Sequence, residues 1–186
     1  MAGKEIDRIA ARVRRCTLCR LSKARKHAVP GEGPCPAKIM LIGQAPGRNE
    51  DRTGRPFIGM AGKFLDKMLK RARIDRKAVF ITSVVKCFPS DNRVPKEDEI
   101  NACNPYLESQ MRLVDPELVV LLGNVAIRTV LGEDHAKGKP VRHGGIIFLP
   151  TYHPAAGMRF PSIHRRMESD FSQIYRHLSG RRPEDL

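Results

Sequence analysis

The feature that most constrains the fold is a short apolar run that leads directly into a glycine-rich segment. Residues 39–42 are uninterrupted apolar residues, as expected for a parallel strand buried on both faces. The next twenty residues, 43–62, read GQAPGRNEDRTGRPFIGMAG and contain five glycines and two prolines. Ligands of open α/β sheets bind beyond the carboxyl ends of strands, so this segment is a candidate site. An ordinary surface loop explains its composition equally well.

Further apolar runs predict the rest of the sheet. Residues 79–85, 118–122 and 146–150 are β-branched or apolar and end at turn signals. Apolar residues at helical spacing lie between them and at both ends of the chain, over 4–14, 63–73, 97–114, 123–131 and 164–178. Strands alternating with helices over short links predict an α/β fold, a three-layer α/β/α sandwich with a central four-stranded parallel sheet.

The length of 186 residues, 41% of them hydrophobic, predicts a single domain over 1–180, followed by a polar tail at 181–186. No apolar run approaches the ~20 residues that cross a bilayer, and the first residues lack the apolar core of a signal peptide. We therefore expect a soluble, cytoplasmic monomer without a membrane partner.

The charge of the chain favours a polyanionic partner. Thirty-four Lys and Arg residues against twenty Asp and Glu residues give a formal net charge of +14, spread along the whole sequence. Counterion release would make a nucleic acid a favourable partner for such a surface. A basic surface without a specific partner is the alternative.

Four of the five cysteines form a candidate metal site. Cys16 and Cys19 make a C-x-x-C pair, Cys87 follows the second predicted strand, and Cys103 lies on the next predicted helix. Four converging sulfurs suit zinc or an iron–sulfur cluster, and the spacing does not choose between them. Cys87 and Cys103 could instead be small buried residues. Cys35 lies between two prolines, without a partner at useful spacing.

Polar groups follow three of the predicted strands. The GQAPG loop begins at Gly43, Ser83 lies in the second strand, and the sequence Tyr152-His153-Pro154 follows the fourth. A histidine before proline is more often structural than catalytic. Three such strand ends at one sheet edge nevertheless favour a functional site.

Together these motifs resemble those of the family 4 uracil-DNA glycosylases, the iron–sulfur branch of that superfamily. The similarity runs from Cys16 to about Tyr175 and includes the C-x-x-C pair, the GQAPGxxEDxTGRPFxGxAG block, ITSVVKC at 81–87, NRxP at 92–95 and TYHPAA at 151–156. The resemblance implies the fold of that superfamily and hydrolysis of the N-glycosidic bond of a deaminated base in DNA, the first step of base excision repair. It also implies that the four cysteines bind a structural [4Fe–4S] cluster.

The reaction suggests roles for residues in these motifs. Glycosidic cleavage leaves an anionic base, so catalysis needs donors aimed at the oxygen where charge develops. Backbone amides near Gln44 and Ala45 and the His153 ring are the expected donors, and Phe57 would stack on the base. By resemblance, Glu50 would activate water, although it could instead cap the following helix. The predicted catalytic residues are thus Glu50 and His153, and the predicted base-binding residues are Gly43, Gln44, Ala45, Phe57, Ser83 and Asn92.

The segment after His153 is expected to enter a DNA groove. By their position, Met158 would act as a wedge between bases and Arg159 would bind a phosphate.

Two positions depart from the family pattern. The family usually has Glu at the position of Gln44 and Asn at the position of Ser83. A serine hydroxyl reads a base edge less strictly than a carboxamide. We therefore expect slow uracil excision or a pocket broadened toward hypoxanthine and xanthine. A non-catalytic lesion-binding protein and a small iron–sulfur electron carrier are the alternatives, and the charge and the site loops disfavour the latter.

Overall fold

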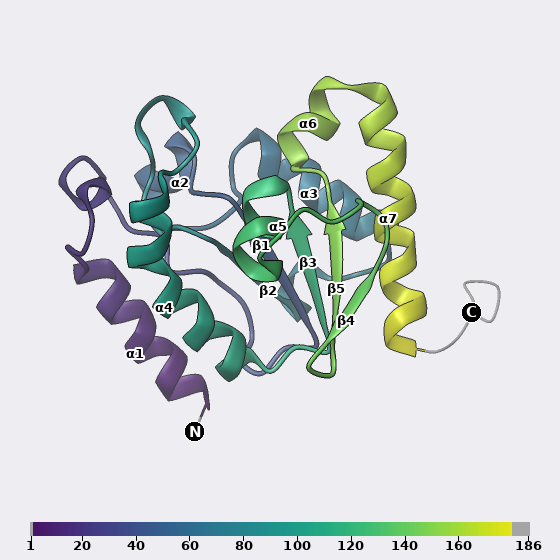
Figure 1. The fold of residues 1–186 in the computed structure, drawn as a ribbon, viewed down its shortest axis with the longest axis horizontal. Coiled ribbons are helices and arrows are strands. Elements are labelled where there is room, and N and C mark those ends of the chain that lie inside the picture. The colour runs from purple at the N-terminus through teal and green to yellow at the C-terminus, as the bar shows by residue number, and fades with distance from the viewer. Residues whose placement is uncertain (1, 180–186) are drawn as a thin grey trace.

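The computed structural model describes residues 2–179, which form one mixed sheet between two layers of helices (Figure 1). The sheet has five strands in the order β2-β1-β3-β5-β4. Their bounds are β1 Ile39–Gly43, β2 Val79–Ser83, β3 Leu118–Leu122, β4 Val141–His143 and β5 Ile146–Thr151. Strands β2, β1, β3 and β5 are mutually parallel and almost entirely buried, which explains their continuous apolar sequences.

The helices cover both faces of this sheet, as the three-layer prediction requires. Their bounds are α1 Ala2–Arg15, α2 Arg48–Thr53, α3 Met60–Arg71, α4 Glu97–Val114, α5 Asn124–Leu131, α6 Pro154–Arg159 and α7 Pro161–Ser179, with short 3-10 turns η1 Arg20–Lys23, η2 Arg76–Ala78 and η3 Ser90–Asn92. Apolar residues of α1, α4 and α5 join one core cluster, and those of α3 and α7 join the other. Alternate residues of each strand point into the two clusters; Met40 and Ile42 face the first, and Leu41 faces the second.

The sheet has one strand more than predicted. Strand β4 pairs antiparallel with β5, and its three residues are exposed or half-buried. Such a short, polar edge strand has no apolar run by which to recognise it, so the sequence predicted four strands. The four predicted strands are confirmed as the parallel part of the sheet.

Two short helices were also absent from the sequence prediction. Helix α2 lies inside the glycine-rich segment, and α6 occupies the stretch expected to enter DNA. Each spans six residues, too few to show a helical apolar period. The predicted tail at 181–186 lies outside the described residues. Within residues 2–179, no helix is long and apolar enough to cross a membrane.

Candidate active site

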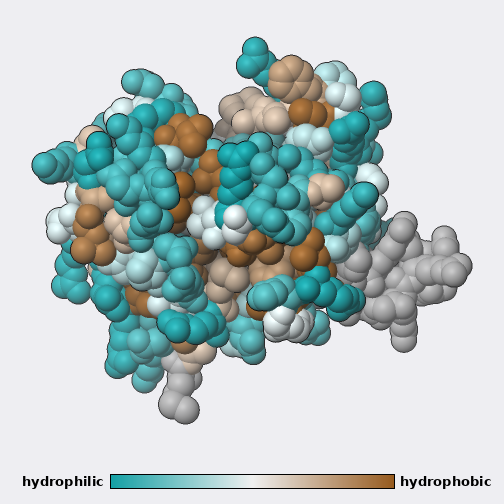
Figure 2. Space-filling view, viewed as in Figure 1, coloured by the Kyte–Doolittle hydropathy of each residue, from teal (hydrophilic) through white to brown (hydrophobic). Residues whose placement is uncertain are grey.

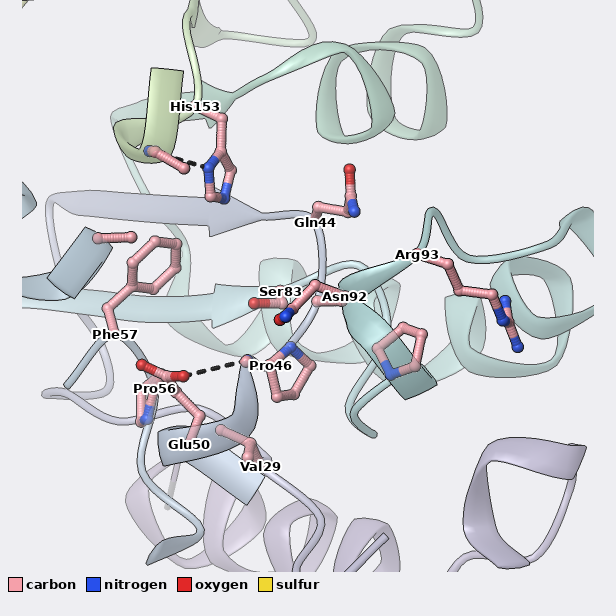
Figure 3. A pocket seen from close by; sticks show the side chains of 15 residues that line it. Val29, Gln44, Pro46, Glu50, Pro56, Phe57, Ser83, Asn92, Arg93 and His153 are labelled. Carbon is pink, nitrogen blue, oxygen red and sulfur yellow. Dashed lines mark hydrogen bonds between the residues drawn. The ribbon is translucent and has the colours of Figure 1, made fainter. Parts of the chain in front are cut away.

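The carboxyl ends of the parallel strands open into a cavity of about 320 Å³. Gly43 ends β1, Ser83 ends β2, and His153 follows β5, so segments distant in sequence meet at one sheet edge. Figure 3 shows the side chains that converge on this cavity. The lining residues are Val29, Gln44, Ala45, Pro46, Gly47, Glu50, Pro56, Phe57, Ala61, Ser83, Pro89, Asn92, Arg93, His153 and Ala155.

Phe57 forms one wall of the cavity in an unusual backbone conformation. Its φ is 49°, a left-handed value that costs a non-glycine residue on the order of 1–2 kcal/mol. Two glycines make room for it. A Cβ at Gly43 would lie 2.5 Å from Cζ of the Phe57 ring, and a Cβ at Gly62 would lie 1.8 Å from the Phe57 carbonyl oxygen. Gly43 therefore backs the Phe57 ring and is not itself a lining residue.

His153 presents a neutral hydrogen-bond donor to the cavity. It caps α6, where its Nδ1 accepts the Ala155 backbone N–H at 3.2 Å. A neutral imidazole that accepts at Nδ1 carries its proton on Nε2. Burial lowers the pKa of His153 to about 4, so the ring is uncharged at neutral pH. Its centroid lies 6.1 Å from that of Phe57, and the two rings border the same space (Figure 3).

The loop after β1 lines the same cavity. The carbonyl oxygens of Gly43 and Gln44 accept the N–H groups of Val84 and Val85, which fixes the loop against the end of β2. Across residues 2–179, the Ala45 N–H meets no protein acceptor, although Ala45 lines the cavity. In Figure 3 the Gln44 carboxamide points away from Ser83 and Phe57.

Ser83 lines the cavity above a buried lysine that the sequence analysis missed. The Lys86 ammonium donates to the Ser83 carbonyl oxygen at 2.6 Å, to Thr82 Oγ1 at 2.7 Å and to Gln110 Oε1 at 2.7 Å. Burial lowers the pKa of Lys86 to about 8. The signal in the sequence was a lysine directly after the apolar run 79–85, where a charged residue needs internal partners.

Glu50 lies in the first turn of α2 and caps that unpredicted helix, and it also bonds to Gly59, the N-cap residue of α3, the next helix, which the sequence had allowed it to cap. Its Oε2 accepts the Gly47 N–H at 3.1 Å, and its Oε1 accepts the N–H groups of Ile58 and Gly59, both at 2.8 Å. The carboxylate also lines the cavity. These bonds fix its orientation, so capping and a role toward a bound water are compatible.

Asn92 and Arg93 approach the cavity from η3. Asn92 has a φ of 54°, a conformation that asparagine tolerates better than most residues, and it lines the cavity. Arg93 was not predicted in the site. Its guanidinium pairs with both oxygens of the buried Glu99, at 2.7 and 2.8 Å, so its charge is directed away from the centre of the cavity.

Met158 and Arg159 lie on α6 and do not line the cavity. The Met158 side chain is exposed, and the Arg159 guanidinium lies 5.4 Å from the ring centroid of the exposed Phe160. Phe160 is a second exposed apolar side chain that the sequence analysis did not consider. The surface is notched between the α4 side and the α6–α7 side of the molecule, and most of the visible face is hydrophilic (Figure 2).

The four candidate metal ligands surround a second, narrower cavity. Cys16, Cys19, Cys87 and Cys103 all line it, between the end of α1 and helix α4. None of the four forms a disulfide within residues 2–179. Cys35 lies apart from this group and donates to the Leu113 carbonyl oxygen at 3.2 Å.

Nitrogen donors surround the sulfurs. Arg25 Nη1 donates to Cys87 Sγ at 3.0 Å, and the Lys86 N–H donates to Cys103 Sγ at 3.3 Å. Burial raises the pKa of Cys103 to about 11. Within residues 2–179, no three His, Cys, Asp or Glu side chains come close enough to ligate one ion. All four sulfurs nevertheless line one cavity, so the four cysteines are candidate ligands of a metal centre.

Comparisons with known proteins agree with the motifs. A sequence profile described as the Uracil DNA glycosylase superfamily matches residues 30–179. The chain is 43% identical to a Type-4 uracil-DNA glycosylase of Sulfurisphaera tokodaii, over 91% of this chain and 83% of that protein. It is 41% identical to a protein of the same description from Saccharolobus solfataricus, over 95% and 88% of the two chains. A third, from Pyrobaculum aerophilum, is 36% identical over 92% and 93%.

Proposed function

This chain belongs to the uracil-DNA glycosylase superfamily, and we propose that it excises uracil from DNA by hydrolysis of the N-glycosidic bond, the first step of base excision repair. The observation that carries the proposal is that His153, Phe57 and Ala45 line one cavity, where the Ala45 N–H has no protein acceptor among residues 2–179. An aromatic ring and neutral donors around one cavity suit a flat heterocycle with a carbonyl group.

The donors would stabilise the departing base. As the bond between the sugar carbon and the base nitrogen breaks, its electron pair moves to the base and charge accumulates on a carbonyl oxygen. His153 Nε2–H and the Ala45 N–H would donate to that oxygen. Because His153 is already neutral and held by Ala155, it needs no reorganisation during the reaction.

Water would complete the reaction at the sugar carbon. Glu50 would orient this water or accept its proton, and the proton finally passes to the released base. Three backbone N–H groups hold the carboxylate at the cavity wall, which supports this positioning role.

DNA would approach across the mouth of the cavity. A base must leave the duplex to enter such a site, at a cost of a few kcal/mol. Exposed Arg48 and Arg52 on α2 and exposed Arg159 on α6 are available for phosphates, and Met158 is exposed where it could fill the gap left by the base.

Ser83 favours a second candidate function, a glycosylase with broader base specificity. Its hydroxyl lines the cavity at a position where the family usually has asparagine, and a hydroxyl can either donate or accept. Hypoxanthine and xanthine would then be rejected less strictly than in a carboxamide-lined pocket. Asn92 would supply the remaining carboxamide.

The four cysteines would bind a [4Fe–4S] cluster. Four cysteines around one cavity, with Arg25 and the Lys86 N–H directed at sulfur, fit such a group. Glycosidic hydrolysis transfers no electrons, so the cluster would tie the end of α1 to α4 and to the segment after β2. A brown protein with broad visible absorbance would identify it.

The deciding experiment uses oligonucleotides with one uracil, hypoxanthine, xanthine or thymine, followed by alkali to cut abasic sites. Scission at uracil supports the proposal, and comparable scission at the purines supports the broader function. His153→Ala should lose scission, while His143→Ala, at an exposed histidine on edge strand β4, should not. Tight binding to uracil DNA without scission would instead make the protein a lesion binder.

A further inference from the structure

The segment that carries Phe57 needs support from outside itself. Residues 54–59 form the connection between α2 and α3, with no strand or long helix to fix them. Phe57 nevertheless holds a left-handed backbone and keeps its ring buried against Gly43. On the cavity side, Glu50 holds the next two amides, those of Ile58 and Gly59. Those bonds do not reach Pro56 or the Phe57 carbonyl.

Arg76 contacts the part of this segment that Glu50 does not hold. From η2, its Nη2 donates to the Pro56 carbonyl oxygen at 2.8 Å, and its Nη1 donates to the Phe57 carbonyl oxygen at 3.2 Å. Asp66 on α3 accepts from the same Nη1 at 2.6 Å. Arg76 does not line the cavity, so it has no direct path to a bound base.

These bonds select one conformation of the chain. In an extended chain, consecutive carbonyl groups point to opposite sides, so one planar guanidinium cannot bond to both. The left-handed turn at Phe57 brings the Pro56 and Phe57 carbonyl oxygens within reach of the same Arg76 fork. Arg76 therefore bonds preferentially to the backbone shape that turns the Phe57 ring toward the cavity.

We propose that Arg76 is a positioning residue that holds the Pro56–Phe57 turn and thereby sets the Phe57 ring against the everted base. This inference rests on the proposed function for the identity of the base. The clamp, by which we mean the two bonds from Arg76 to the Pro56 and Phe57 carbonyl oxygens, is a property of the free protein. Asp66 aligns the guanidinium, and the Arg55 side chain fixes the residue before the turn through its bonds to Glu32 at 2.7 and 2.9 Å.

The rival explanation is that Arg76 only adds stability through its ion pair with Asp66. Both side chains are partly exposed, and such pairs contribute little. A purely stabilising role would act independently of the Phe57 ring. A positioning role would act through that ring, so the two explanations differ in how Arg76 and Phe57 couple.

A double-mutant cycle tests that coupling. One readout is the single-turnover excision rate. The other is base eversion, measured by the fluorescence of 2-aminopurine placed beside a non-cleavable 2′-fluoro-deoxyuridine. Arg76→Ala should lower both the rate and the eversion signal, the rate by about ten- to hundred-fold. In a Phe57→Ala background, Arg76→Ala should have little further effect. Additive losses would overturn the proposal.

A matched control and a conservative variant separate positioning from stability. Arg71→Ala removes an arginine that pairs with Glu168 at 2.6 Å at the end of α3, and it should leave rate and eversion unchanged. Arg76→Lys retains a charge for Asp66 but cannot span both carbonyl groups. It should keep the melting temperature near the wild-type value and still lose eversion. Full base eversion by the Arg76→Lys variant would refute the claim that the two bonds of the guanidinium hold the turn.

Hydrogen exchange in the free protein tests the clamp without any activity. The N–H groups of Ile58 and Gly59 are bonded to Glu50, and they follow the turn directly. Arg76→Ala or Arg76→Lys should speed their exchange, while Arg71→Ala should not. Unchanged exchange would overturn the clamp. If the wild-type protein failed to excise uracil, the proposed function would fall, and the exchange result would still decide the role of Arg76.

Discussion

Replacement of His153 by alanine is the most direct test of the proposed chemistry. The structure gives this ring one free donor, because Nδ1 is occupied by the Ala155 N–H at 3.2 Å. Loss of one such preorganised donor typically costs ~3–4 kcal/mol, or roughly a hundred- to thousand-fold in rate. We expect a fall of that size in the single-turnover rate at saturating enzyme, with little change in affinity for DNA.

The pH dependence of that effect provides a second, independent check. Since burial lowers the pKa of His153 to about 4, only about a tenth of the rings would be protonated at pH 5. The ratio of wild-type to His153→Ala rates should therefore stay constant from pH 8 down to about pH 5.5. It should change only as the pH approaches 4, where protonation displaces the Ala155 bond at Nδ1 and puts a charge on the ring.

The assay is quenched-flow excision from a uracil oligonucleotide, buffered at constant ionic strength because DNA binding depends on salt. His143→Ala, at an exposed histidine on β4, is the control. A rate loss below about tenfold would show that His153 is not a principal donor. A ratio that changes with a midpoint near pH 6.5 would show that the ring is solvated and that our account of its protonation is wrong.

Three further predictions concern specificity, the cysteine site and DNA contact. Ser83→Asn should speed uracil excision or raise the preference of the enzyme for uracil over hypoxanthine by about ten-fold, because a bidentate carboxamide discriminates between bases by ~1–3 kcal/mol. An unchanged rate and preference would assign the reading of the base to another group. Cys87→Ser should remove visible absorbance and lower the melting temperature by several degrees; an unchanged spectrum would exclude Cys87 as a ligand. Arg159→Ala should weaken DNA binding and lower the magnitude of the salt slope by about one, whereas slower chemistry at saturation would contradict a phosphate contact.

The sequence was most informative where burial left few alternatives. The four parallel strands are apolar throughout because helices cover both of their faces, so each appeared as a continuous run. Helix α4 was predicted with its observed bounds, Glu97–Val114, because acidic residues begin it and Asp115-Pro116 ends it. Strand β4 escaped prediction because its short edge position requires no particular residues.

Residue types also identified candidates for the site but not their partners. The order of motifs placed Gln44, Ser83 and His153 at strand ends, and a parallel sheet brings such ends together. The lysine after the apolar run 79–85 signalled a buried charge, but nothing local indicated that Gln110 of α4 would bind Lys86 or that Arg76 would hold Phe57. These two contacts join segments that meet only when the layers pack.

The sequence by itself determined the family, the parallel core and the list of chemically competent residues, because buried strands and motif spacing depend on short stretches of chain. Only the tertiary structure decided which atoms are free to act. It showed that His153 carries its proton on Nε2, that Glu50 is held by three backbone amides and that the Phe57 turn rests on Arg76. Some of these bonds join different segments and others cap a helix, so all of them exist only after the chain has folded.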